Sequence, residues 1–243
     1  MIPIGDENIT RRAPVVNTLL LLANIGVFGY MLTLGDAGVE RFILAWGVRA
    51  ADVFALVGGD LSLLRPVLTA ASASMFLHGG WAHIIGNMLF LWIFGDNVED
   101  NFGSLAYLLF YLLSGYAAVG AQTLLAPQSQ VPMIGASGAI SGVLAGYLLL
   151  YPSAAVRAVL PIPILFLFSF YVPAWLMIIM WFVGQLLNGL ATLTDAALMT
   201  GGVAYGAHVG GFLAGLALTG LFRTPTRPPR YMDYGRNARY YRR

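Results

Sequence analysis

The sequence predicts an all-α membrane protein in which six membrane-spanning helices form one bundle. Hydrophobic residues make up 58% of the 243 residues and charged residues only 10%, whereas a soluble domain carries about 25% charged residues. The apolar residues also gather in segments of roughly the 20 residues that a helix needs to cross a bilayer. Because a helix satisfies its own backbone hydrogen bonds, a helical bundle is the structure expected in lipid.

Six segments have the composition of membrane spans. In chain order they are 14–34, 80–95, 104–126, 135–151, 172–191 and 201–222. The fourth is short, and the fifth has a blurred start because 159–171 is also apolar. We therefore expect a transmembrane domain over 14–222, preceded by a cytoplasmic segment over 1–13. A basic, disordered cytoplasmic tail is expected over 223–243.

The connections between the spans differ in length. The outer one over 35–78, between the first two spans, mixes short apolar runs with isolated charges. A loop of this length in a compact bundle is usually functional or partly structured, so we expect short helices at the membrane interface. On the inner side, Gly95 and Asp96 are expected to end the second span, and 153–171 to run along the membrane.

The distribution of arginine predicts the orientation of the chain. All thirteen basic residues are arginine. With six spans and a cytoplasmic N-terminus, only Arg41, Arg49 and Arg65 lie outside, as the excess of basic residues in cytoplasmic loops requires. The inner loop over 96–103 opposes this, because it holds only acidic residues. We expect a multi-pass protein of a bacterial cytoplasmic membrane, with both termini in the cytoplasm and no nucleic-acid partner.

Two polar residues are expected to lie at one depth in the membrane. Ser137 begins the fourth span, and Pro152 closes it. A helix of this length rises roughly 21 Å in an apolar core of about 30 Å, which places Ser137 roughly 10 Å below the outer surface. The sixth span enters from the same side near Gly201, so His208, seven residues into that span, is expected at the same depth. Glycine stripes on both spans favour a close approach of the helices; packing alone explains the stripes, but not the shared depth.

Serine and histidine at one depth favour nucleophilic chemistry. A serine hydroxyl becomes a nucleophile when a neighbouring imidazole takes its proton. A helix N-terminus, such as that at Ser137, stabilises a developing oxyanion. His83 and Asn87 share a face of the second span and are suitable donors to the same oxyanion. The alternative is that histidines such as His83 and His208 make interhelical hydrogen bonds that stabilise the bundle.

The sequence provides no acidic third member for this pair. Asp96, Glu99 and Asp100 lie at the far end of the second span, and Asp195 lies in an outer loop thirteen residues before His208. We therefore predict a Ser–His dyad rather than a triad. Metal chemistry is not indicated either, because the chain has no cysteine and its histidines lack nearby carboxylates to support a metal site.

Three segments resemble the signature segments of the rhomboid family of intramembrane serine proteases, in the family's order. They are H-G-G-W-A-H-I-I-G-N at 78–87, G-A-S-G at 135–138 and A-H-V-G-G at 207–211. The resemblance covers about residues 8–222. It implies cleavage of transmembrane proteins in or near the bilayer by a Ser137–His208 dyad through an acyl-enzyme, without a metal or cofactor.

The resemblance also assigns supporting roles. His83, Asn87 and the backbone N–H of Ser137 would form the oxyanion hole. His78 would lie beside the site, or else be an interfacial histidine that holds the loop. Some family members carry an aromatic residue against the catalytic histidine at the position of Ser141.

Other aromatic residues near the site have two possible roles. Tyr205 precedes His208 by three residues on the same helix and would either support the imidazole or lie at the interface. Trp175, Trp181 and Phe182 are candidates for a lateral gate on the fifth span, or else face lipid. The family's Trp-Arg pair in the outer loop is absent at Arg65, which Leu64 precedes.

Two alternatives from other functional classes remain open. One is a catalytically silent member of the same fold that binds transmembrane clients without cutting them. The other is a channel or proton-coupled transporter with His83 and His208 on its path, which would be expected to carry carboxylates within the membrane. In the first and favoured interpretation the partners are transmembrane protein substrates and the lipid bilayer.

Overall fold

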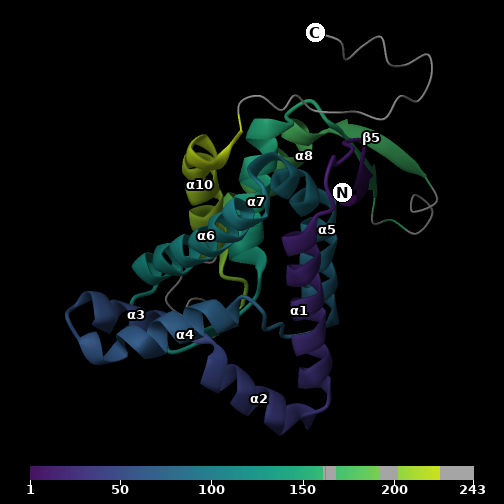
Figure 1. Ribbon diagram of the computed structural model, residues 1–243. Helices are drawn as coiled ribbons and strands as arrows, with labels where there is room; N and C mark the ends of the chain where they lie inside the picture. The colour runs from purple at the N-terminus through teal and green to yellow at the C-terminus, as the bar shows by residue number, and fades with distance from the viewer. Residues whose placement is uncertain (161, 163–167, 192–201, 225–243) are drawn as a thin grey trace, which may run out of the picture.

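The computed structural model describes residues 1–160, 162, 168–191 and 202–224, and these are mostly helical (Figure 1). The helices are α1 (Val15–Leu32), α2 (Gly35–Trp46), α3 (Ala50–Val57), α4 (Leu64–Ser74), α5 (Trp81–Phe102), α6 (Ser104–Leu125), α7 (Ser137–Leu150), α8 (Ala174–Ala191) and α10 (Tyr205–Phe222), with a 3-10 turn η1 (Leu61–Leu63). The strands are β1 (Ile2–Asp6), β2 (Val48–Arg49), β3 (Pro132–Met133), β4 (Ala155–Val159) and β5 (Ser169–Pro173).

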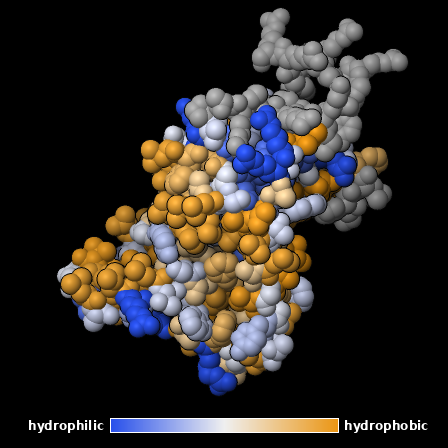
Figure 2. Space-filling model, viewed as in Figure 1, coloured by the Kyte–Doolittle hydropathy of each residue, from blue (hydrophilic) through white to orange (hydrophobic). Residues whose placement is uncertain are grey.

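Among the described residues, four helices, α1, α6, α8 and α10, are long and apolar enough to cross a membrane. Helix α7 is apolar but only 14 residues long, and α5 carries polar residues towards its end. Hydrophobic residues cover most of the middle of the face in Figure 2, and polar residues gather towards its two ends. The chain is therefore built as a multi-pass membrane protein.

The helix ends agree with the predicted spans at most places. Helices α1, α6, α7 and α8 begin and end within two residues of the first, third, fourth and fifth predicted spans. Three predicted features lie outside the described residues: Asp195, the start of the sixth span at Gly201, and the tail beyond Thr224.

Helix α7 lies at the centre of the bundle, with ten of its 14 residues buried. Its glycines face those of α10. A Cβ at Gly211 would overlap the carbonyl oxygen of Gly138, and a Cβ at Gly215 would stand 2.5 Å from the Cα of Gly142. The two backbones therefore touch, which is the close approach that the glycine stripes predicted.

The prediction that the second span ends at Asp96 is wrong, because α5 continues to Phe102. Glu99 of this extension is buried and accepts hydrogen bonds from the backbone N–H groups of Val16 and Asn17, at 3.0 and 2.7 Å. These donors belong to the first turn of α1 and have no partner within their own helix. Because a neighbouring helix satisfies its carboxylate, Glu99 is accommodated in α5, and the expected inner loop over 96–103 is helical as far as Phe102.

Two small sheets mean that the all-α prediction holds only for the larger part of the chain. In one sheet the antiparallel strands follow the order β1-β4-β5; the other pairs β2 with β3. The first sheet includes much of the segment 153–171, which was predicted to be an inner loop. Strands of two to five residues leave little periodic pattern in the sequence, and β1 and β2 also pair with remote partners, so the strands were missed.

The outer connection over 35–78 contains α2, α3, η1 and α4, at the end of the bundle opposite the N-terminus and β5 (Figure 1). This connection makes hydrogen bonds to the loop that precedes α7. The Gly135 N–H donates to the Ser74 carbonyl at 2.8 Å, and the Ala51 N–H donates to the Ser129 carbonyl at 3.1 Å. The β2–β3 pairing adds a further tie. The long connection therefore positions the loop that leads to Ser137.

A buried polar network ties β1 to the helices at the end that carries the three-stranded sheet. The Asp6 carboxyl accepts hydrogen bonds from the Tyr147 hydroxyl at 2.5 Å and from the Asn97 amide at 3.2 Å. Asn8 donates to the same Tyr147 hydroxyl at 2.7 Å. Burial is the largest influence on Asp6 and raises its pKa to about 7, with a further increase from Asp96, although the bond from Tyr147 opposes this.

We predict that Asp6 by itself contributes a loss of stability as the pH rises from about 4 to about 7. In that window the folded state keeps the Asp6 proton and the unfolded state, with its pKa near the ordinary 3.8, does not, so unfolding releases protons. Asp6→Asn should reduce this dependence, measured as the midpoint of thermal unfolding in detergent against pH. The exposed Asp36→Asn is the control, and equal slopes in the two variants would contradict the assignment.

We also predict that Gly211→Ala strongly destabilises the bundle, because the new methyl group would overlap the Gly138 backbone rather than a movable side chain. Overpacking of this kind costs about 1–3 kcal/mol or more. Gly220→Ala on the same helix is the matched control, since nothing lies within 4 Å of its Cβ position. Thermal unfolding in detergent compares them, and similar midpoints would show that the α7–α10 contact is not tight.

Candidate active site

Ser137 is the first residue of α7, and the loop before it makes room for its neighbours. Gly135 has φ +116°, a conformation that favours glycine. A Cβ at Gly135 would also stand 2.6 Å from Nε2 of His83 and 3.7 Å from Nδ2 of Asn87. The glycine before the serine therefore brings the loop close to both side chains of α5.

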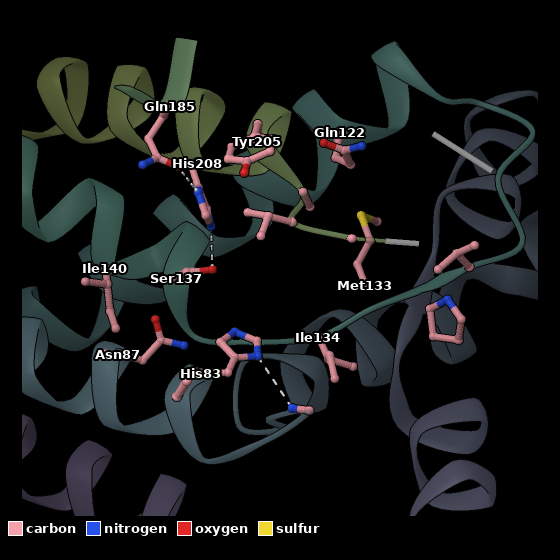
Figure 3. A pocket seen from close by; sticks show the side chains of 18 of the residues that line it. His83, Asn87, Gln122, Met133, Ile134, Ser137, Ile140, Gln185, Tyr205 and His208 are labelled. Carbon is pink, nitrogen blue, oxygen red and sulfur yellow. Dashed lines mark hydrogen bonds between the residues drawn. The ribbon is translucent and has the colours of Figure 1, made fainter. Parts of the chain in front are cut away.

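His208 lies in the first turn of α10 and contacts Ser137 directly. Its Nε2 is 2.7 Å from the Ser137 Oγ, and its Nδ1 is 2.7 Å from Oε1 of Gln185 on α8 (Figure 3). An amide oxygen only accepts hydrogen bonds, so the proton lies on Nδ1 and Nε2 is left to accept from the serine hydroxyl. In this tautomer His208 is arranged as a base towards Ser137.

His83 and Asn87 of α5 line the cavity with Ser137 and His208, on the other side of the serine from His208 (Figure 3). The Gly79 N–H donates to Nδ1 of His83 at 3.4 Å. In the neutral ring Nε2 then carries the proton, next to Gly135. The Asn87 amide bonds to Nε2 of His78 at 2.9 Å through one of its two hydrogens, so the second hydrogen remains available as a donor.

His78 and Ser141 lie next to the site without contacting its centre. His78 is buried, and its ring lies edge-on to His83 with ring centres 4.9 Å apart. Burial, assisted by His83, lowers the pKa of His78 to about 4, so His78 is neutral at physiological pH. The Ser141 hydroxyl donates to the Ser137 carbonyl at 2.6 Å, so it is engaged within its own helix.

Two aromatic rings flank His208. Tyr205 lies edge-on at 6.2 Å between ring centres, and Trp181 of α8 lies at 6.1 Å and 34°. Of the other two predicted gate residues, Phe182 stacks on Phe212 at 4.2 Å and Trp175 is exposed.

Gln185 is the contact of His208 that the sequence analysis missed. The available signal was an amide inside an apolar span, four residues after Trp181 and therefore on the same helix face. Gln122 of α6 was missed as well; its side chain accepts a hydrogen bond from the Ala207 N–H at 3.2 Å, one residue before His208.

One cavity of about 1140 Å³ is lined by side chains that include Ser137, His208, His83, Asn87, Gln185 and Gln122. The cavity brings together a hydroxyl, an imidazole that accepts its hydrogen bond, and two further N–H donors. Within the described ranges, no group of three His, Asp or Glu side chains could hold a metal ion. The arrangement suits nucleophilic attack on a carbonyl.

Comparison with known proteins identifies relatives that are named as rhomboid proteins. The chain is 35% identical over 123 residues to rhomboid-like protein 11, chloroplastic, of Arabidopsis thaliana, covering 49% of this chain and 44% of that protein. It is 32% identical over 135 residues to rhomboid protease GluP of Bacillus subtilis, covering 56% and 24%. RHOMBOID-like protein 4 of Arabidopsis thaliana is 40% identical over 73 residues, covering 30% and 18%. The matched regions cover less than half of each relative.

The match to the family as a whole extends further along the chain. Residues 65–225 match the rhomboid domain, which is more than half of the 243 residues. This range includes Ser137, His208, His83 and Asn87, as well as Gln185. The chain therefore belongs to the rhomboid family.

Proposed function

We propose that this protein is an intramembrane serine endopeptidase that cleaves transmembrane proteins in or near the bilayer. The observation that carries the proposal is the 2.7 Å contact between the Ser137 Oγ and the unprotonated Nε2 of His208. Membership of the rhomboid family and the similarity to a relative named as a protease support the same reading.

The chemistry follows from these two side chains. As the Ser137 oxygen attacks a peptide carbonyl, His208 takes the hydroxyl proton at Nε2 and then gives it to the departing amine. An acyl-enzyme remains on Ser137. Water then attacks the ester carbonyl with His208 again as the base, which releases the carboxylic acid and restores the serine. The site cavity gives water a place beside the serine.

The negative oxygen of each tetrahedral intermediate requires donors. The donors that we assign to this oxygen are Nε2–H of His83 and the second amide hydrogen of Asn87, both on α5, and the Ser137 backbone N–H at the start of α7. Such donors are most effective when they are held in place before the reaction. The Gly79 and His78 contacts provide this support for His83 and Asn87.

The membrane setting follows from the same proposal. Helices α5 and α7 join the four long apolar helices as six spans, with both termini on the cytoplasmic side of a bacterial membrane. The substrate is then another transmembrane segment. A helix keeps its carbonyls in backbone hydrogen bonds, so the segment must unwind locally before Ser137 reaches a peptide bond.

We predict that a fluorophosphonate probe labels the purified protein in detergent, and that Ser137→Ala and His208→Ala abolish the labelling. The probe reacts with activated serines, so both the nucleophile and its base are required. Ser141→Ala is the control for a second serine on the same helix, and it should retain the labelling.

Cleavage of a transmembrane reporter should follow the same pattern. A folded wild type that neither labels nor cleaves would contradict the proposal and would favour a member that binds clients without cutting them. Labelling that survives Ser137→Ala would place the nucleophile elsewhere.

We further predict that His83→Ala and Asn87→Ala lower kcat by about 10²–10³-fold with little change in KM, because an oxyanion donor acts mainly in the transition state. The exposed Ile85→Ala, on the same helix, should leave kcat unchanged. Steady-state cleavage of the reporter measures all three. An unchanged kcat in both donor variants would remove α5 from the oxyanion hole.

A further inference from the structure

Helix α8 contacts His208 through two side chains one helical turn apart. Gln185 reaches Nδ1 at 2.7 Å, and the Trp181 ring lies 6.1 Å from the imidazole. Both residues lie on the same face of α8, since they are four positions apart. His208 is thus held between Ser137 on one nitrogen and α8 on the other (Figure 3).

We propose that Gln185 is the positioning residue for His208, and that the packing of α8 against α10 allows the imidazole to act as a base. This inference rests on the protease function proposed above. Gln185 acts through His208 and does not touch the substrate.

The first step of the argument concerns the proton on the imidazole. A neutral histidine carries one proton, and the hydrogen bond to one ring nitrogen decides where it lies. With Oε1 of Gln185 accepting from Nδ1, Nε2 presents a lone pair to the Ser137 hydroxyl. Without this acceptor, the proton could move to Nε2, where the ring could no longer take the serine proton.

The second step concerns charge. In soluble serine proteases an aspartate holds the histidine in this tautomer, but a carboxylate inside a membrane is costly. The groups that contact His208 from α7 and α8 are Ser137, Gln185 and Trp181, and none is acidic. A neutral amide supplies the same acceptor without a buried charge.

The third step concerns the position of Ser141, where some family members have an aromatic residue. Ser141 bonds to the Ser137 carbonyl and does not reach the imidazole. In this chain one of the two aromatic rings beside His208, that of Trp181, comes instead from α8, and the other is Tyr205 of α10. The Trp181 ring and the acceptor are thus supplied by the same helix.

The last step links the position of α8 to catalysis. The buried residues of α8, Ala174, Met177 and Ile178, all lie in its first two turns. The turn that carries Gln185 is seated by the stacking of Phe182 on Phe212, at 4.2 Å, and by the bond to His208. An outward displacement of α8 would break that bond. Helix α8 must therefore be packed against α10 when the proton moves from Ser137 to His208.

The test compares three variants in detergent: Gln185→Met, Gln185→Glu and, as the control, the exposed Leu187→Met on the same helix. Methionine keeps the volume and removes the acceptor. Glutamate keeps an acceptor of the same shape that cannot donate when ionised. Reporter cleavage is measured as kcat and KM against pH, together with fluorophosphonate labelling and thermal unfolding.

For Gln185→Met we expect kcat to fall about 10- to 100-fold, with KM unchanged within about two-fold. Gln185→Glu should restore kcat at high pH and move the acidic limb of the pH–rate profile to higher pH, because a carboxylate favours the charged imidazolium. The other titratable groups that face His208 among the described residues, His83 of α5 and Tyr205 of α10, are the same in both variants. Leu187→Met should match the wild type.

A Gln185→Met variant that is folded and has the wild-type kcat and pH profile would overturn the inference. If that variant does not fold, Gln185→Glu decides, because an unshifted acidic limb would equally exclude the contact. These outcomes differ from failure of the protease proposal, in which the wild type itself neither labels nor cleaves.

Discussion

The direct contact between the backbones of α7 and α10 is the constraint on which the rest of the structure depends. Gly138 and Gly142 of α7 meet Gly211 and Gly215 of α10 with no side chain between them. Lipid provides little hydrophobic drive between helices, so close packing of small residues holds such pairs together. The same contact sets the site, because Ser137 directly precedes Gly138 and His208 lies one turn before the α10 glycines.

Polar groups stabilise the two ends of the bundle, in addition to the glycine contact at its centre. At the end with the outer connection, α3, α4 and the β2–β3 pair hold the loop at Gly135 against His83. At the other end, Glu99 caps α1 and Asp6 ties β1 to α7. Glu99 and Asp6 therefore each have partners on another element, as a buried carboxyl group requires.

Much of the helical framework could be predicted, because apolar runs report membrane spans directly. The predicted elements differ from those in the structure where a side chain has its hydrogen-bond partner far away in the sequence. Glu99 is accommodated within α5 because the first turn of α1 supplies its donors, and α1 lies more than 60 residues away in the sequence. Strand β1 was missed for the same reason, since it pairs with β4, which lies far away along the chain.

The sequence by itself determined the apolar helices, the rhomboid likeness and the choice of Ser137 and His208 as a candidate pair, because composition, spacing and motifs are local properties. Only the tertiary structure decided which groups surround the imidazole. Gln185 and Trp181 come from α8, and no local pattern specifies the face that this helix turns towards α10. A contact between two helices depends on their relative position and rotation, which arise from the packing of the whole bundle.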